Sequence, residues 1–329
     1  MKYCAALMID PKSHILDLDL MSLSQVEAIL DDADEMTKIL NSDFKKTEEL
    51  KGKTIITLFF EPSTRTRSSF EQAGKILGAD VINIVNSSSS SKKGESLYNT
   101  ALTIQSIKSD VIVLRHPHSG APYFLSKLLQ ESTIINAGDG MHAHPTQALL
   151  DMYVMKKHLG TLKNKRIVFI GDISHSRVVR SNILGLSKFG AKIVLCGPQT
   201  LIPPDFLSNK HLPENHPFKN IFYEPKLNDA IDQADVIMPL RLQRERQDSG
   251  LLPSLREYST YFGISLKKLQ NAKPNTIVMH PGPVNEGVEI DHNVVHGQNS
   301  VIQEQVFSGV AIRMAILKSV TQNKALKVE

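Results

Sequence analysis

The feature that most constrains this chain is an alternation of short β-branched runs with longer segments of helical periodicity. The alternation runs through the 329 residues twice. In the first half, strands are expected at Thr54–Phe60, Val81–Val85, Val111–Leu114 and Ile134–Asn136. In the second half, they are expected at Arg166–Gly171, Lys192–Gly197, Asp235–Leu240 and Thr276–His280. A repeated β-α order predicts an α/β protein with two doubly wound domains, each a mainly parallel sheet flanked by helices.

Two further helices are expected to join the halves. Pro145–His158 has helical spacing and begins with proline, which is tolerated at the first helical position. Gln303–Gln322 reads as a closing helix. Both are candidates for bridging helices between the domains.

Composition excludes several classes of protein. The formal charge of +4 is mild, which argues against a nucleic-acid partner. Cys4 and Cys196 are far apart, so no disulfide framework is expected and a reducing cytoplasm is predicted. No window approaches the ~18 apolar residues of a membrane span, and the N-terminus lacks a signal-peptide pattern, so no membrane association is expected.

The strongest chemical signal is the segment Phe60-Glu61-Pro62-Ser63-Thr64-Arg65-Thr66-Arg67, at the end of the first expected strand. A chain that leaves a strand and enters a helix presents unpaired N–H groups at the positive end of the helix dipole. Hydroxyls and a guanidinium there match phosphate oxygens. The alternative is a helix cap followed by a basic surface turn, but this density of donors favours an anion site.

Other candidates follow neighbouring strands. Arg115 ends one, Asn136–Gly140 reads as a tight turn, and His144 and Gln147 enter the bridging helix. His142 and His144 form an H-x-H pair, but no cysteine or carboxylate at ligand spacing accompanies it, so no metal is predicted.

The second half supplies two arginines just after strands, Arg177 and Arg241. The turn at Gly171 lacks the G-x-G-x-x-G spacing, which disfavours a dinucleotide. Two arginines suit a dicarboxylate ligand. Surface ion pairs remain an equal alternative from these residues alone. The run Ser87–Ser91, followed by Lys92–Glu95, predicts a flexible solvated loop by composition.

Taken together, these segments resemble the aspartate carbamoyltransferase catalytic-chain family over nearly the whole length. The matching segments, in the family's order, are Phe59–Arg67, Lys92–Glu95, Arg115–Pro117, Asn136–Gly140, His144–Gln147, Gly171–Asp172 with Arg177, Arg241–Gln243 and His280–Pro283. Eight segments in order at compatible spacings make a chance match implausible.

The resemblance implies a carbamoyl-phosphate-binding domain over 1–145, completed by the C-terminal helix 302–322, and an aspartate-binding domain over 146–301. It implies a cytoplasmic homotrimer with active sites between subunits. Ser89 and Lys93 would then reach into the adjacent subunit's site, so the serine run is expected to be functional. Regulatory chains or a dihydroorotase as partners are left open.

The resemblance also assigns roles by position. Carbamoyl phosphate would be bound by Ser63, Thr64, Arg65, Thr66, Arg115, His144, Gln147, Gly282 and Pro283. L-Aspartate would be bound by Lys93, Arg177, Arg241 and Gln243. The catalytic set would be Arg65, Thr66, Arg115, His144 and Lys93. At Gly282, where family members often have leucine or alanine, the required backbone carbonyl is still present.

The implied reaction transfers the carbamoyl group of carbamoyl phosphate to the α-amine of aspartate, an early step of de novo pyrimidine biosynthesis. It needs no cofactor and no metal. The nearest alternative is an ornithine carbamoyltransferase, whose H-C-L-P and S-M-G segments are missing here. A non-catalytic assembly partner is the other, and it is disfavoured because the chain keeps Arg65, Lys93, Arg115, His144, Arg177 and Arg241.

Overall fold

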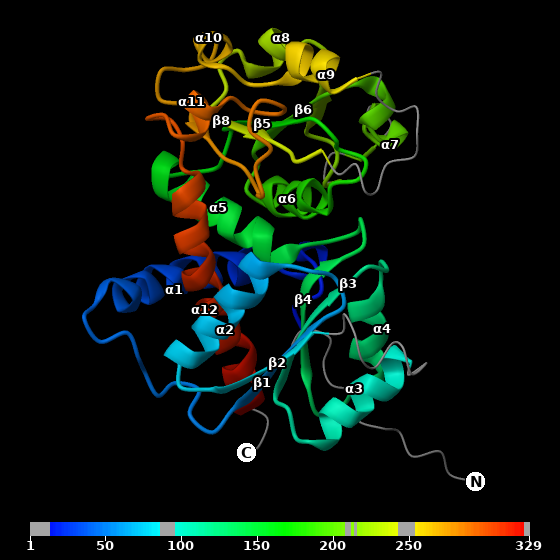
Figure 1. The fold of residues 1–329 in the computed structure, drawn as a ribbon, viewed down its shortest axis with the longest axis vertical. Helices are drawn as coiled ribbons and strands as arrows, with labels where there is room; N and C mark the ends of the chain where they lie inside the picture. The colour runs from blue at the N-terminus through cyan, green and yellow to red at the C-terminus, as the bar shows by residue number, and fades with distance from the viewer. Residues whose placement is uncertain (1–13, 86–95, 208–211, 214–215, 243–253, 326–329) are drawn as a thin grey trace. The chain divides into compact units, whose positions relative to one another are not determined.

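The computed structural model describes residues 14–85, 96–207, 212–213, 216–242 and 254–325 (Figure 1). The chain forms two compact units. Unit 1 comprises Met1–Thr146 with Ser308–Glu329, and unit 2 comprises Gln147–Phe307. Both boundaries fall inside helices, α5 (Pro145–Leu159) and α12 (Ile302–Ala325).

Unit 1 contains a four-stranded parallel sheet in the order β2-β1-β3-β4. Its strands are β1 (Thr54–Phe59), β2 (Asp80–Val85), β3 (Val111–His116) and β4 (Thr133–Asp139). Its helices are α1 (Leu23–Asn41), α2 (Thr64–Ile76), α3 (Leu97–Ser106) and α4 (Ala121–Leu128), with a 3-10 turn at Leu18–Leu20. Helices α3 and α4 cover one face of the sheet, and α1, α2 and the unit-1 part of α12 cover the other (Figure 1).

The period-2 pattern of the strands produces these two faces. Ile56 and Leu58 of β1 point to the same side and pack in one cluster with Ala101 of α3 and Leu125 of α4. All four are buried, and so are Ile55, Thr57 and Phe59 on the opposite face of β1, because helices cover both faces of the sheet. Helix α2 ends at Ile76 with Leu77 as its C-cap, and Gly78 follows with a φ of +86°, which would strain other residues.

Unit 2 contains a five-stranded parallel sheet in the order β7-β6-β5-β8-β9. Its strands are β5 (Arg166–Ile170), β6 (Lys192–Cys196), β7 (Ile221–Tyr223), β8 (Val236–Pro239) and β9 (Ile277–Val278). Its helices are the unit-2 part of α5, α6 (Arg177–Lys188), α7 (Pro204–Leu207), α8 (Leu227–Ile231), α9 (Leu255–Phe262), α10 (Leu266–Leu269) and α11 (His292–Val295), with a 3-10 turn at Gln199–Leu201. Helix α6 lies on one face of this sheet, and α8 to α11 lie on the other (Figure 1).

The prediction of two parallel sheets flanked by helices is confirmed. One local expectation was wrong. The tight turn expected over Asn136–Gly140 is largely strand, because β4 extends to Asp139 through an irregular register opposite Leu114 and His116 of β3. The short helix α7 and the strand β7, of only four and three residues, were not predicted from the sequence. No helix in the described ranges is both long and apolar enough to cross a bilayer.

Candidate active site

The predicted anion cradle and Arg115 lie at adjacent strand ends in unit 1. Strands β1 and β3 are neighbours, and the Phe60 N–H donates to the Arg115 carbonyl at 2.9 Å. The helix that follows β1 is α2 and the helix that follows β3 is α4, and these two cover opposite faces of the sheet. Such a point, where successive connections diverge, is where open parallel sheets bind ligands.

The cradle itself is the N-terminus of α2. Ser63 is the N-cap residue, and its side chain makes no capping hydrogen bond. Thr64 and Arg65 are exposed, whereas Thr66 is buried with a relative exposure of 6%. No acidic residue lies in the first turn of this thirteen-residue helix. The backbone N–H groups and the Ser63 hydroxyl are therefore available to an anion, and the helix dipole favours one there.

Arg115 is held in a fixed orientation. Its Nε lies 3.0 Å from Oε2 of Glu61, and its Nη1 donates to the Ala137 carbonyl at 3.2 Å. The Arg115 side chain is only 13% exposed and that of Glu61 22%. These contacts come from the segment after β1 and from β4, so both neighbouring strand ends position the guanidinium.

His144 is 5% exposed and follows a segment that Asp139 fastens to the end of β4. The fully buried Asp139 carboxylate accepts the Ala143 N–H at 3.1 Å and the Gly120 N–H at 2.7 Å. The His142 Nδ1 lies 3.1 Å from the same carboxylate, and this hydrogen bond raises the pKa of His142 above its ordinary value. His142 thus supports the loop that carries His144.

Unit 2 has the same arrangement of strand ends. Strands β5 and β8 are neighbours, and the helices after them, α6 and α9, lie on opposite faces of the sheet. Arg177 is the first residue of α6 and is 5% exposed, and Arg241 follows β8 by two residues. The two predicted dicarboxylate-binding arginines therefore lie at the carboxyl ends of adjacent strands.

Gln147 belongs to a buried network that the sequence did not reveal. Its Nε2 donates to Oδ1 of Asp151 at 3.0 Å. The same carboxylate accepts from Gln305 Nε2 at 2.8 Å and from Asn182 Nδ2 at 2.9 Å. Asp151 is fully buried, and its partners lie on α5, α6 and α12. An i, i+4 spacing on α5 was the only signal of this cluster in the sequence.

The turn at Gly282–Pro283 is braced from within unit 2. The Gly282 N–H donates to Nδ1 of His280 at 2.9 Å, and the His280 N–H donates to Oε1 of Gln305 at 2.9 Å. Gly282 has a φ of +67°, where glycine is favoured, and the Gly282–Pro283 peptide is cis. Gln305 thus contacts both the Asp151 network and the residue that orients this turn.

The loop residues Ser89 and Lys93, and Gln243, lie outside the described residues, so their predicted roles stay predictions.

Comparison with known proteins places this geometry in a family. Residues 13–157 match the model of the aspartate/ornithine carbamoyltransferase carbamoyl-P binding domain, and residues 163–320 match that of the Asp/Orn binding domain. The chain belongs to the aspartate/ornithine carbamoyltransferase family. The family predicted from the sequence is therefore confirmed.

Within the aspartate/ornithine carbamoyltransferase family, the similar relatives are aspartate carbamoyltransferase catalytic subunits. The one from Dehalococcoides mccartyi strain CBDB1 is 53% identical over 303 residues, which cover 92% of this chain and 90% of the relative. The one from Ruminiclostridium cellulolyticum is 51% identical over 308 residues, covering 94% and 95%.

Solved structures of the family show the same fold. The catalytic subunit of M. jannaschii aspartate transcarbamoylase is 37% identical, with a TM-score of 0.81 and coverage of 95% of this chain and 99% of that one. The Trypanosoma cruzi aspartate transcarbamoylase in complex with N-(phosphonacetyl)-L-aspartic acid is 32% identical, with a TM-score of 0.83 and coverage of 93% and 95%.

Proposed function

We propose that the protein is an aspartate carbamoyltransferase, which transfers the carbamoyl group of carbamoyl phosphate to the α-amine of L-aspartate. The observation that carries this proposal is the pair Arg177 and Arg241 at neighbouring strand ends of unit 2. Two guanidiniums match the two carboxylates of aspartate, and they would repel the cationic side chain of ornithine. The names of the similar relatives support the same substrate.

The reaction begins with attack of the aspartate amine on the carbonyl carbon of carbamoyl phosphate. Thr66, Arg115 and His144 donate to the oxyanion of the tetrahedral intermediate. The Glu61–Arg115 ion pair supports this role, because a preorganised donor needs little reorganisation during the reaction. The Gly282 and Pro283 carbonyls accept hydrogen bonds from the carbamoyl amine and the attacking amine.

Collapse of the intermediate expels phosphate, whose charge is held by Ser63, Arg65, Thr66, Arg115 and Lys93. Thr64 and Gln147 complete the binding of carbamoyl phosphate, and Gln243 that of aspartate. No covalent intermediate is required, since orientation of two mutually repelling anions supplies much of the acceleration. The departing phosphate accepts the amine proton.

The assignment of units to substrates follows from these roles. Residues 1–145 with 302–322 form the carbamoyl-phosphate-binding domain, and 146–301 form the aspartate-binding domain. The protein acts in the cytoplasm as a homotrimer in pyrimidine biosynthesis, and Ser89 and Lys93 enter the adjacent subunit's site. The edge strand β2, which ends shortly before Ser89 in the sequence, exposes the apolar side chains of Ile82 and Val85, at 44% and 40%. This exposed apolar surface supports a contact with another subunit at β2.

A carbamoyl-transfer assay with aspartate and ornithine in parallel tests the substrate. Carbamoyl-aspartate is the expected product. Production of citrulline alone, or of neither product, would overturn the proposal. Arg65→Ala should abolish turnover and carbamoyl-phosphate binding together, and Arg256→Ala, an exposed arginine of α9, serves as the matched control.

Mixed trimers test the shared site. Inactive Lys93→Ala and inactive Arg65→Ala proteins are mixed, and trimer mass is checked by size-exclusion measurement. Partial recovery of activity is expected, because some sites then combine an intact cradle with an intact loop. No recovery in verified mixed trimers would show that each site is built from one subunit.

A further inference from the structure

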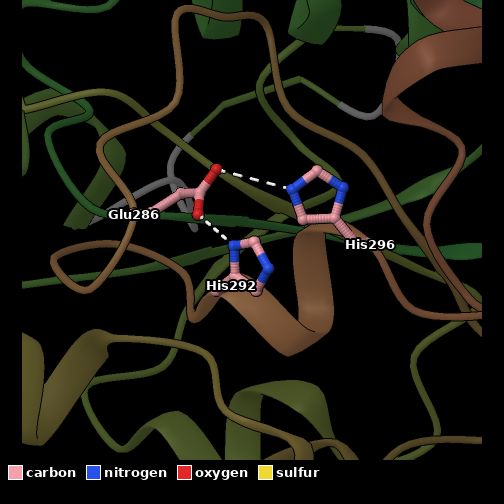
Figure 2. Close-up of side chains that lie close together, drawn as sticks. All are labelled: Glu286, His292 and His296. Carbon is pink, nitrogen blue, oxygen red and sulfur yellow. Dashed lines mark hydrogen bonds and ion pairs between the residues drawn. The ribbon is translucent and has the colours of Figure 1, made fainter.

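A separate cluster of side chains in unit 2 has the composition of a metal site. Glu286 lies on the segment after the Gly282–Pro283 turn, and His292 and His296 lie on and just after α11 (Figure 2). The Glu286 Oε2 is 2.6 Å from Nδ1 of His292, and its Oε1 is 3.6 Å from Nε2 of His296. Each imidazole thus approaches a different oxygen of one carboxylate.

Local structure brings these groups together. The two histidines are four residues apart, which places both on one side of a helical turn. Their ring centroids are 4.5 Å apart with an interplanar angle of 50°. The buried Val294 and Val295 between them fix the turn against the core of unit 2. The Gly287 N–H donates to the Ile290 carbonyl at 2.9 Å, which holds the Glu286 segment near α11.

The distances fit a small divalent cation. One candidate ligand atom from each residue lies within 4.8 Å of the others. In a tetrahedral zinc site with bonds of about 2.0–2.1 Å, ligand atoms are roughly 3.3 Å apart. The side chains are 69%, 53% and 42% exposed for His292, His296 and Glu286, so they have room for the short rotation required.

The chemistry also fits. Imidazole and carboxylate are ligands of zinc and of other first-row transition metals. The ordinary alternative is a His292–Glu286 hydrogen bond and a longer His296–Glu286 ion pair, with no metal. Within the described ranges, this is the one group of three or more such side chains with convergent ligand atoms.

We propose that Glu286, His292 and His296 bind one zinc ion or a similar divalent transition-metal ion. Three protein ligands leave a fourth position to water, so the ion is exchangeable rather than enclosed. The site lies outside the carbamoyl-transfer machinery, which needs no metal. Its existence does not depend on the proposed function.

The test is metal binding to the untagged full chain. Equilibrium dialysis against Zn²⁺ should give one equivalent per chain, and a Co²⁺ titration should give the visible absorption of a low-symmetry N/O site. The His292→Ala/His296→Ala double variant should bind at least about 100-fold more weakly, because loss of ligands costs more than the 10–100-fold typical of their supporting residues. Glu286→Gln, which keeps the shape of the side chain, should also weaken binding.

His158→Ala is the matched control. It removes an imidazole from another His–Glu ion pair, in which His158 Nε2 lies 2.6 Å from Glu304 Oε2, and it should leave the zinc stoichiometry unchanged. Circular dichroism verifies that each variant is folded. Absence of zinc binding, or equal affinity in the folded double variant, would overturn the proposal.

Discussion

Replacement of Asp151 by asparagine should destabilise unit 2 and impair the site together. The fully buried carboxylate accepts three amide hydrogen bonds, from Gln147 at 3.0 Å, Gln305 at 2.8 Å and Asn182 at 2.9 Å. Asparagine keeps the shape of the side chain but replaces one acceptor oxygen with an NH₂ group, which then faces an N–H donor of a neighbouring amide. The loss of about one hydrogen bond to a charged group corresponds to about 1.5–3 kcal/mol in the free energy of unfolding.

The Asp151→Ala variant sets the upper limit of the loss in the free energy of unfolding. Hydrogen bonds to charged groups contribute about 1.5–3 kcal/mol each, but these three losses do not add in full. Asn182 Nδ2 also donates to the Val178 carbonyl at 3.0 Å, and Gln147 is 9% exposed. Removal of one partner from a buried charged network typically costs about 3–5 kcal/mol, which we expect for Asp151→Ala.

Thermal melting measures the effect. For a domain of this size, 1 kcal/mol shifts the melting temperature by about 2–4 °C, so Asp151→Asn should lower it by about 3–12 °C. Glu304→Gln is the control, because its carboxylate binds Lys157 and His158 at a partly exposed site, with 25% exposure of the Glu304 side chain. That change should cost about 1 kcal/mol or less.

The same variant tests the positioning of Gln147. Since Asp151 fixes the Gln147 Nε2, its loss should raise the KM for carbamoyl phosphate more than that for aspartate. An Asp151→Asn protein that melts no lower than Glu304→Gln would refute the stability argument. Unchanged KM values would refute the positioning role.

Three further changes have expected outcomes. Glu61→Gln should lower kcat by about 10-fold or more at saturating substrates, because it loosens Arg115 from its 3.0 Å ion pair; an unchanged kcat would contradict this. Arg241→Ala should chiefly raise the KM for aspartate, so an unaltered value would exclude the residue from aspartate binding. His142→Gln should destabilise the fold mainly at low pH. Asp139 raises the folded-state pKa of His142 above 6.5, so protonated His142 stabilises the folded state in full below about pH 6.5. That stabilisation is lost as the pH rises through the folded-state pKa. Melting temperatures of the wild type and His142→Gln, measured from below about pH 6.5 to above it, test this expectation. A difference in melting temperature that does not change with pH would count against the His142–Asp139 ion pair.

Much of the fold was determined by the sequence alone. Alternating β-branched and helical segments predicted two parallel sheets, because side-chain periodicity is a local property of each element. The Ser63–Arg67 cradle was predicted for the same reason, because the strand end, the helix start and the three hydroxyl side chains lie within one short stretch of the chain. Strand β7 escaped prediction because three residues carry too little periodicity.

Only the tertiary structure decided which distant segments meet. In unit 1, β1 lies beside β3, so Arg115 lies at the same edge of the sheet as the Ser63–Arg67 cradle. In unit 2, β5 lies beside β8, so Arg177 and Arg241 lie at the same edge of their sheet. The burial of Asp151 among partners as distant as Gln305 followed from the same packing. A buried polar group is stabilised by a hydrogen-bond partner, and here the partners of Asp151 are far apart in the sequence. The periodic pattern of a single helix or strand does not reveal such pairs.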